Sequence, residues 1–212
     1  MENLSTFLFS PIGVIFAWIF FGVSHTFLAS NWLKKRVPLS PQSYRRGFVT
    51  IAILWVSTLF AFSFYEVPTS ILSVVVNADL LKIALAASSF IAGNLMFLWS
   101  FKTMGIEGLK EFAGLSKEKF SFIDTGVYAF CRHPLYTAAI LLVSSVAIIS
   151  LTPRVLSASG MVVLYFILGS IPEEKKLQKY IPQYVDYKRQ VSKFFPWRPK
   201  HWRVFMNSRV KS

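Results

Sequence analysis

Two groups of ionisable residues in the C-terminal half of the chain could do chemistry together. One is segment 132–136, which reads Arg-His-Pro-Leu-Tyr, and the other is the pair Glu173 and Glu174. Guanidinium and imidazole groups donate hydrogen bonds to anions, whereas carboxylates accept hydrogen bonds from ammonium and hydroxyl groups. If the fold brings the two groups together, a basic pair faces an acidic pair in one site.

The composition shows what kind of fold must position these residues. Hydrophobic residues make up 54% of the 212 residues and charged residues only 16%, yet the net charge is +13. A soluble globular chain has roughly 25% charged residues. This combination excludes a disordered tail and an ordinary cytosolic enzyme. The single cysteine, Cys131, excludes a disulfide-stapled domain, because it has no partner within the chain.

Five apolar runs without charge are each long enough, or nearly so, to cross a bilayer as a helix. They cover residues 11–28, 48–65, 83–101, 135–151 and 155–171. Only Thr152, Pro153 and Arg154 separate the last two, which predicts a tight hairpin of the fourth and fifth helices. We therefore predict a single all-α integral-membrane domain over residues 1–212, with about five transmembrane helices.

The basic residues predict the orientation of these helices, because cytoplasmic loops are rich in Lys and Arg. Apart from Lys82 and Arg154, every Lys and Arg falls in segments 31–47, 102–134 and 173–212. This distribution places the N terminus outside and the C terminus in the cytoplasm. It also argues against a nucleic-acid partner, because the charges flank membrane spans, where membrane lipid is the expected partner.

The predicted hairpin returns both ionisable groups to the same cytoplasmic membrane edge. Pro134 suits the first turn of the fourth helix, where its missing N–H would have no partner in the helix. Arg132 and His133 then stand at the start of that helix, and Tyr136 lies in its first turn. Glu173 and Glu174 follow the end of the fifth helix.

The tail, residues 173–212, is predicted to be amphipathic and helical. Apolar and aromatic residues recur at helical spacing, namely Leu177, Ile181, Tyr184, Tyr187, Val191 and Phe194. Pro182 disfavours helix at the residue before it, which predicts two helices, 173–180 and 183–193. Segment 194–197, Phe-Phe-Pro-Trp, would end the second helix at the bilayer interface. The tail is then either a surface helix or a lid over the two ionisable groups.

In this order, the C-terminal motifs are similar to those of a known family. The motifs are Arg132-His133-Pro134-x-Tyr136, Glu173-Glu174-x-x-Leu177, Tyr184-x-x-Tyr187 and the closing Phe-Phe-Pro-Trp. They resemble the signature of integral-membrane methyltransferases, including isoprenylcysteine carboxyl methyltransferases and phospholipid methyltransferases. The N-terminal half looks most like the methanethiol S-methyltransferase branch, through His25 and segments 32–35 and 105–110.

The resemblance implies that S-adenosylmethionine is the methyl donor. The predicted catalytic residues are Glu173 and Arg132, and the predicted cofactor-binding residues are Arg132, His133, Tyr136, Glu173, Glu174, Leu177 and Tyr184. The carboxylates would accept from the ribose diol and the ammonium group, whereas Arg132 and His133 would bind the carboxylate of the donor. Tyr136, Leu177 and Tyr184 would form an apolar slot for adenine. A thiol or carboxylate of an apolar small molecule or a lipid would accept the methyl group.

Other functions stay open at this point. A membrane reductase of the sterol-reductase type shares an Arg-His-Pro-x-Tyr element but uses NADPH. A small transporter or accessory protein would use the polar residues for topology alone. His25, His133 and His201 are too far apart in sequence for a recognisable metal motif, so no metal is expected. We expect His25 and Asn94 to form hydrogen bonds between helices, with a substrate-side role as the alternative for each. We expect Cys131 to be inert.

Overall fold

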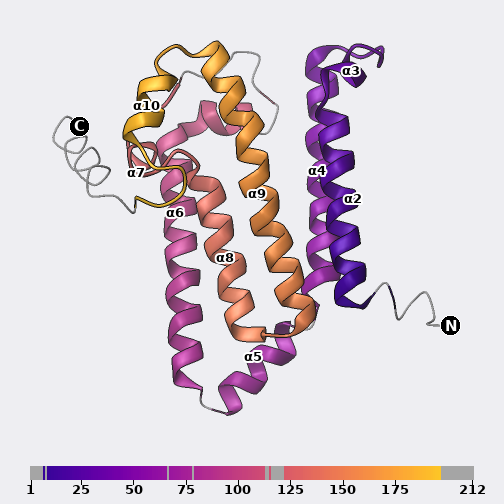
Figure 1. Ribbon diagram of the computed structural model, residues 1–212, viewed down its shortest axis with the longest axis vertical. Helices are drawn as coiled ribbons and strands as arrows, with labels where there is room; N and C mark the ends of the chain where they lie inside the picture. Colours follow the sequence, from indigo (N-terminus) through magenta and orange to yellow (C-terminus); the bar gives the residue numbers. More distant parts are fainter. Residues whose placement is uncertain are drawn as a thin grey trace.

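The computed structural model describes residues 7, 9–65, 67–77, 79–112, 115 and 122–196, and within them it contains helices and no named strand. The helices are α2 (Pro11–Ala29), α3 (Asn31–Lys34), α4 (Pro41–Phe64), α5 (Val67–Val76), α6 (Leu80–Phe112), α7 (Val127–Phe130), α8 (Pro134–Ser150), α9 (Pro153–Tyr180) and α10 (Tyr184–Gln190). Figure 1 shows the long helices side by side, with α3 and α10 at one end of the bundle and α5 at the other.

Each of the five predicted spans coincides with a helix, so the all-α membrane fold is confirmed. By length and composition, α2, α4, α6 and α9 can each cross a membrane, whereas α8 is apolar but has 17 residues. Five crossings therefore stay a prediction, as does the orientation of the termini. We call the end that carries α3 and α10 the predicted cytoplasmic end.

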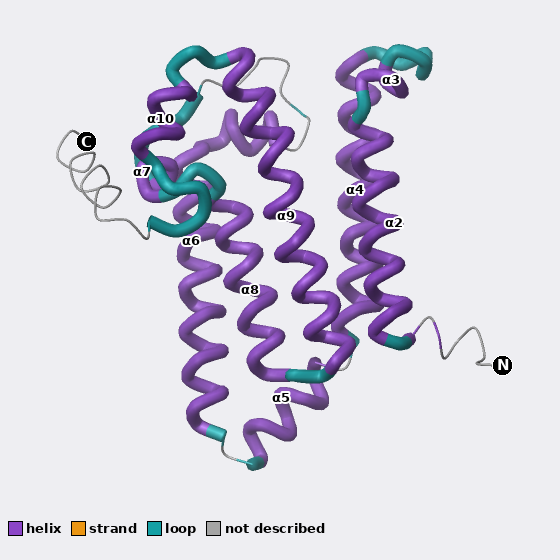
Figure 2. The backbone as a smooth tube through the Cα atoms, viewed as in Figure 1, coloured by secondary structure: helices purple, strands orange, loops and turns teal. Residues whose placement is uncertain are grey.

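The core of the bundle lies where α2, α4 and α9 meet, and the tube view shows α9 between α8 and the α2–α4 pair (Figure 2). Its buried residues are Val14, Trp18, Phe21, Leu59, Val143, Ala158 and Val162. The indole N–H of Trp18 donates to Ser63 Oγ over 3.1 Å and joins α2 to α4. Many apolar side chains on the outside, such as Phe20, are exposed, as expected for helices that face lipid.

The predicted hairpin of the fourth and fifth helices is confirmed. α8 ends at Ser150, Leu151 takes a left-handed conformation with φ of 50°, and α9 begins at Pro153. The hydroxyl of Thr152 caps α9 by accepting from the N–H of Val155 over 3.3 Å. This turn places the start of α8 and the far end of α9 together at the predicted cytoplasmic end.

Arg154, one of the two basic residues outside the predicted cytoplasmic segments, is buried at the hairpin. Its guanidinium donates to the backbone carbonyls of Phe9 and Phe62. It also lies over the ring of Phe62, 4.5 Å from the centroid, and over that of Tyr65 at 4.9 Å. Arg154 thus joins the start of α9 to the end of α4 and to the residues before α2.

Two predicted boundaries were wrong. We predicted a loop from residue 102 and a separate tail helix from residue 173. Instead, α6 continues to Phe112 across a kink at Gly105, which has φ of 65° and ψ of −175°, a conformation open to glycine. α9 runs unbroken through Pro172 to Tyr180. A proline removes one backbone hydrogen bond but fits a helical φ, so the helix continues where side-chain contacts hold its next turn.

The break at Pro182 is confirmed, because α9 ends at Tyr180 and α10 begins at Tyr184. α10 ends at Gln190, three residues before the predicted end of the second tail helix. The predicted interface position of Trp197, and the tail from 197 to 212, lie outside the described residues.

The interface between α6 and α8 depends on small residues. Ser89 Oγ of α6 donates to the carbonyl of Leu141 over 2.8 Å. A Cβ added at Gly93 would lie 2.9 Å from Leu142 Cγ and 3.1 Å from the carbonyl oxygen of Ala138. The two backbones approach this closely because Gly93 has no side chain.

We therefore expect Gly93→Ala to destabilise the protein by about 1 to 3 kcal/mol through overpacking. Gly160→Ala is the matched control, because a Cβ at that α9 position meets nothing within 4 Å. The measurement is thermal unfolding of both purified variants in detergent. Equal midpoints for the two variants would contradict the close packing of α6 on α8.

Candidate functional site

The start of α8 and the end of the tail lie against each other at the predicted cytoplasmic end. His133 is the N-cap of α8 and Pro134 is its first residue, as predicted. The N–H of Arg132 donates to the carbonyl of Ser192 over 2.9 Å, and the N–H of His133 donates to that of Lys193 over 3.1 Å. These backbone bonds fix segment 192–193 beside the predicted basic pair.

Arg132 and Glu174 form a buried ion pair between the start of α8 and the predicted cytoplasmic end of α9. Nε and a terminal nitrogen of Arg132 each lie 2.9 Å from Glu174 Oε1. The other terminal nitrogen donates to the carbonyl of Lys188 over 3.0 Å and to that of Val191. All three guanidinium nitrogens thus bind groups of the chain itself, and Arg132 joins α8, α9 and the tail after α10.

Two further nitrogens bind Glu174. His133 Nε2 lies 3.1 Å from Glu174 Oε1, and Lys188 Nζ lies 3.1 Å from Oε2. Burial by itself would raise the pKa of Glu174, but the hydrogen bonds with His133, Lys188 and Arg132 and the charge of Arg132 outweigh it and lower this pKa to about 2. With a side chain only 6% exposed, Glu174 is an ionised structural carboxylate at neutral pH.

Glu173 has a different environment from its neighbour. Its side chain is 44% exposed, and its Oε2 accepts from the hydroxyl of Tyr136 over 2.8 Å. His133 Nδ1 lies 3.7 Å from the same oxygen, so the imidazole stands between the two carboxylates. Successive residues of a helix point about 100° apart, and α9 therefore buries Glu174 while it presents Glu173 at the surface.

Tyr136 extends the site along α8 into the bundle. One side of its ring stacks on His133 at 5.2 Å and 13°, and its ring also contacts Phe166 of α9 at 4.7 Å. Next to Phe166, the hydroxyl of Tyr165 lies 3.2 Å from His25 Nδ1. The prediction that His25 bonds between helices is confirmed, because this contact joins α2 to α9.

Within the described part of the chain, Asn94 bonds inside its own helix and not between helices as we expected. Its amide donates to the carbonyl of Phe90 in its own helix over 2.9 Å. Four-residue spacing allows a short polar side chain to reach back to the preceding turn.

The three residues predicted to hold adenine fall into two groups. Tyr136 packs with His133 and Phe166, as described above. Leu177 and Tyr184 belong to a second apolar cluster, completed by Tyr187, Val191, Phe122 and Ile181. Tyr184 is only 2% exposed, so it supports the tail from within rather than offering a free ring face. The structure thus brings Arg132, His133, Tyr136, Glu173 and Glu174 together. Tyr184 interacts with Arg132 from beneath the tail, and Leu177 packs in the same apolar cluster as Tyr184.

Sequence reasoning missed Lys188 and Phe166. Lys188 binds Glu174 from α10, and nothing in its spacing distinguishes it from the other bases of the tail. Phe166 lies within an apolar span, and only its place one residue after the polar Tyr165 sets it apart.

Cys131 is fully buried, and burial raises the pKa of its thiol to about 12. It is therefore a poor nucleophile at neutral pH, in accord with the expected inert role. Among the described residues, no three His, Cys, Asp or Glu side chains form a group that could hold a metal ion.

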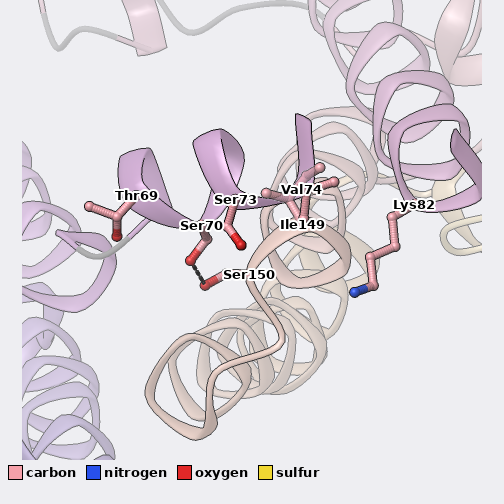
Figure 3. Close-up of a pocket in the computed structure, with 7 residues that line it drawn as sticks. All are labelled: Thr69, Ser70, Ser73, Val74, Lys82, Ile149 and Ser150. Atoms are coloured by element: carbon pink, nitrogen blue, oxygen red, sulfur yellow. Dashed lines mark hydrogen bonds between the residues drawn. The ribbon is translucent and has the colours of Figure 1, made fainter. Parts of the chain in front are cut away.

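Two surface hollows lie away from this site. One, of about 370 Å³, is lined by Asn31, Trp32, Lys35 and Arg36. The other, of about 340 Å³, lies at the opposite end and is lined by Thr69, Ser70, Ser73, Val74, Lys82, Ile149 and Ser150 (Figure 3). The hydroxyl oxygens of Ser70 and Ser150, which both line this hollow, lie 2.9 Å apart and form a hydrogen bond.

Stability should fall on acidification because of Glu174. Its folded pKa of about 2 lies below its ordinary value of 4.5, so its contribution is complete above about pH 5 and is lost as the pH falls towards 2. This contribution is on the order of 2 to 3 kcal/mol at neutral pH. Thermal unfolding across this pH range measures it.

Glu174→Gln should unfold at lower temperature at pH 7 and lack this part of the acid dependence. Glu107→Gln is the control, because Glu107 is exposed and pairs with Lys110, one turn away on its own helix. An unchanged pH profile in Glu174→Gln would show that the buried ion pair does not stabilise the fold.

Comparison with known proteins supports the resemblance for the first two of the C-terminal motifs. The family model described as phospholipid methyltransferase matches residues 81–183. The matched region runs from α6 through α8 and α9, so it contains Arg132, His133, Glu173 and Glu174.

No curated protein and no solved structure matches the chain. The likeness of the N-terminal half to methanethiol S-methyltransferases stays a prediction. Residues 81–183 are thus similar to the phospholipid methyltransferase family, a family of membrane methyltransferases that includes the isoprenylcysteine carboxyl methyltransferase type.

Proposed function

We propose that this membrane protein transfers the methyl group of S-adenosylmethionine to a thiol or carboxylate of an apolar small molecule or lipid, at the predicted cytoplasmic membrane edge. The single observation that carries the proposal is the exposed carboxylate of Glu173, which Tyr136 and His133 hold at the rim of a buried ion-pair network. The match to a methyltransferase family supports the type of reaction.

The polar groups of the donor suit the residues at this rim. Its ammonium group or ribose diol would bind Glu173, which is the exposed acceptor of the site. The ring of Tyr136 lies beside this carboxylate, between His133 and Phe166, and gives an apolar edge for a flat group. S-adenosylmethionine supplies an electrophilic methyl group on a sulfonium.

The bonding of Arg132 changes the role that we propose for it. Its guanidinium nitrogens already bind Glu174 and two backbone carbonyls, so Arg132 is not open to the carboxylate of a ligand in this arrangement. We assign Arg132, Glu174 and Lys188 a positioning role, in which they hold the tail against α8 and α9. Glu173 and Tyr136 are then the residues that contact the donor.

The acceptor should be an anion in the reacting state. Methyl transfer is an in-line displacement, in which the protein must chiefly hold nucleophile, methyl carbon and sulfur in a row. A thiolate or carboxylate cancels the sulfonium charge as the bond forms, and a site with little water favours that loss of charge. An apolar acceptor dissolved in the bilayer would reach the site from the lipid side of the helices.

The binding of the donor can be tested without knowledge of the acceptor. S-adenosylmethionine or its demethylated product should raise the unfolding temperature of the purified protein in detergent, and NADPH should not. Glu173→Gln should weaken this binding about 10- to 100-fold, the cost of losing a hydrogen bond to a charged group. Glu107→Gln is the control, since it removes an exposed carboxylate from a different helix, α6. The proposal fails if Glu173→Gln binds like the wild type, or if only NADPH stabilises the protein.

Tyr136→Phe separates the hydroxyl from the ring. The ring contacts with His133 and Phe166 persist in this variant, so its unfolding temperature without ligand should stay within a few degrees of that of the wild type. Loss of the donor to Glu173 Oε2 should weaken donor binding by about three- to tenfold. A variant that binds as tightly as the wild type would remove Tyr136 from the proposed site.

A further inference from the structure

The end of α2 carries a basic hollow that the proposed reaction does not use. Asn31, Trp32, Lys35 and Arg36 line it, and its volume is about 370 Å³. It therefore combines an amide, an indole ring and two cations, and it follows directly after Ala29, the last residue of a membrane-spanning helix. In Figure 1, α3 lies on the far side of α9 from α10, away from the proposed methyl-transfer site.

The guanidinium of Arg36 is held in place by the ring of Trp32, which lines the same hollow. The guanidinium carbon of Arg36 lies 3.7 Å from the centroid of the Trp32 ring. Such a contact holds the charge in place while the edge of the guanidinium, with its N–H groups, can still bind an anion. The side chain of Lys35, which lines the same hollow, adds a second positive charge.

An apolar stripe leads along α2 to this hollow. Phe20, Val23 and Phe27 recur at helical spacing and are 66%, 65% and 50% exposed. The ring of Phe27 contacts that of Trp32 at 5.6 Å, and Trp32 itself is 54% exposed. Tryptophan is typical of the level at which headgroups meet hydrocarbon. The stripe and the hollow thus form one surface that changes from apolar to cationic at Trp32.

Positive charges from three helices gather near the hollow. Burial lowers the pKa of Lys34, and the nearby charges of Lys176 and Arg45 lower it further. These three residues come from α3, α9 and α4, so the repulsion acts between separate helices. An anion at this place would reduce that repulsion.

We propose that this surface is a binding site for an anionic phospholipid of the predicted cytoplasmic leaflet. The phosphate lies in the hollow against Lys35, Arg36 and Asn31, and an acyl chain lies along Phe20, Val23 and Phe27. The stripe favours a lipid over a free phosphate, because a soluble anion would use the hollow alone and leave the exposed rings uncovered. A bound lipid of this kind would join the α2–α4 pair to the end of α9 through Lys176.

Lipid binding can be measured on the full chain in a neutral detergent, by native mass spectrometry and by thermal unfolding. Phosphatidylglycerol should bind and stabilise at concentrations at which phosphatidylcholine and inorganic phosphate do not. The double variant Lys35→Gln, Arg36→Gln should bind phosphatidylglycerol on the order of 10- to 30-fold more weakly, since each cation near an anionic headgroup contributes about 1 kcal/mol.

The matched control is the double variant Lys110→Gln, Arg189→Gln. Both of its side chains are partly or largely exposed, each pairs with an acid on its own helix, and neither lines the hollow. It removes the same charge from the predicted cytoplasmic side and should keep wild-type affinity. Both double variants should unfold like the wild type without lipid, because all four residues lie at the surface.

Two results would overturn this proposal. Equal affinity of the two double variants for phosphatidylglycerol would show that only the overall charge of the surface matters. Stabilisation by inorganic phosphate or phosphatidylcholine that equals that by phosphatidylglycerol would exclude an anionic lipid as the occupant. Neither result depends on methyl transfer, so the lipid site and the proposed function can fail separately.

Discussion

The buried ion pair of Arg132 and Glu174 holds the predicted cytoplasmic end of the molecule together. It joins three parts of the chain that are far apart in sequence, namely the start of α8, the end of α9 and the tail after α10. Removing one partner of a buried ion pair destabilises a fold by about 3 to 5 kcal/mol, because the other charge is left buried without compensation. Lys188 and His133 satisfy the remaining capacity of the carboxylate, which makes the arrangement a closed network rather than a single contact.

This network explains how two neighbouring glutamates come to differ. Glu174 is buried, and its carboxylate is bound by its partners. The side chain of Glu173 is partly exposed to solvent. The rigidity of the first fixes the position of the second, because both belong to one turn of α9. His133 touches both carboxylates, and its ring carries Tyr136 on one side. A small cationic ligand would therefore meet a carboxylate whose position is set before the ligand arrives.

Sequence patterns were sufficient to place the five long apolar helices and to predict that the two ionisable groups meet. Hydropathy located each of these helices, and the short separation of the fourth and fifth apolar runs predicted that the start of α8 and the end of α9 lie at one edge. The sequence did not predict that α9 continues through Pro172. The helix-breaking tendency of a proline can be read from the local sequence, whereas the tertiary contacts that hold the following turn cannot. For the same reason, the sequence could not show that the chain itself satisfies Arg132 or that Tyr184 is buried beneath the tail. Residue types reveal which groups can bind charge, but only the packing decides which of them are left for a ligand.

We propose that Glu173, at the rim of this network, serves methyl transfer from S-adenosylmethionine. The most direct test is a radiolabelled methyl-transfer assay with the purified protein over a panel of thiols, prenyl-cysteines and lipids. We expect the label to move to a thiol or carboxylate acceptor, and we expect Glu173→Gln to lose most of this activity while its unfolding temperature is retained. Transfer by Glu173→Gln at the rate of the wild type would contradict the proposed role of Glu173.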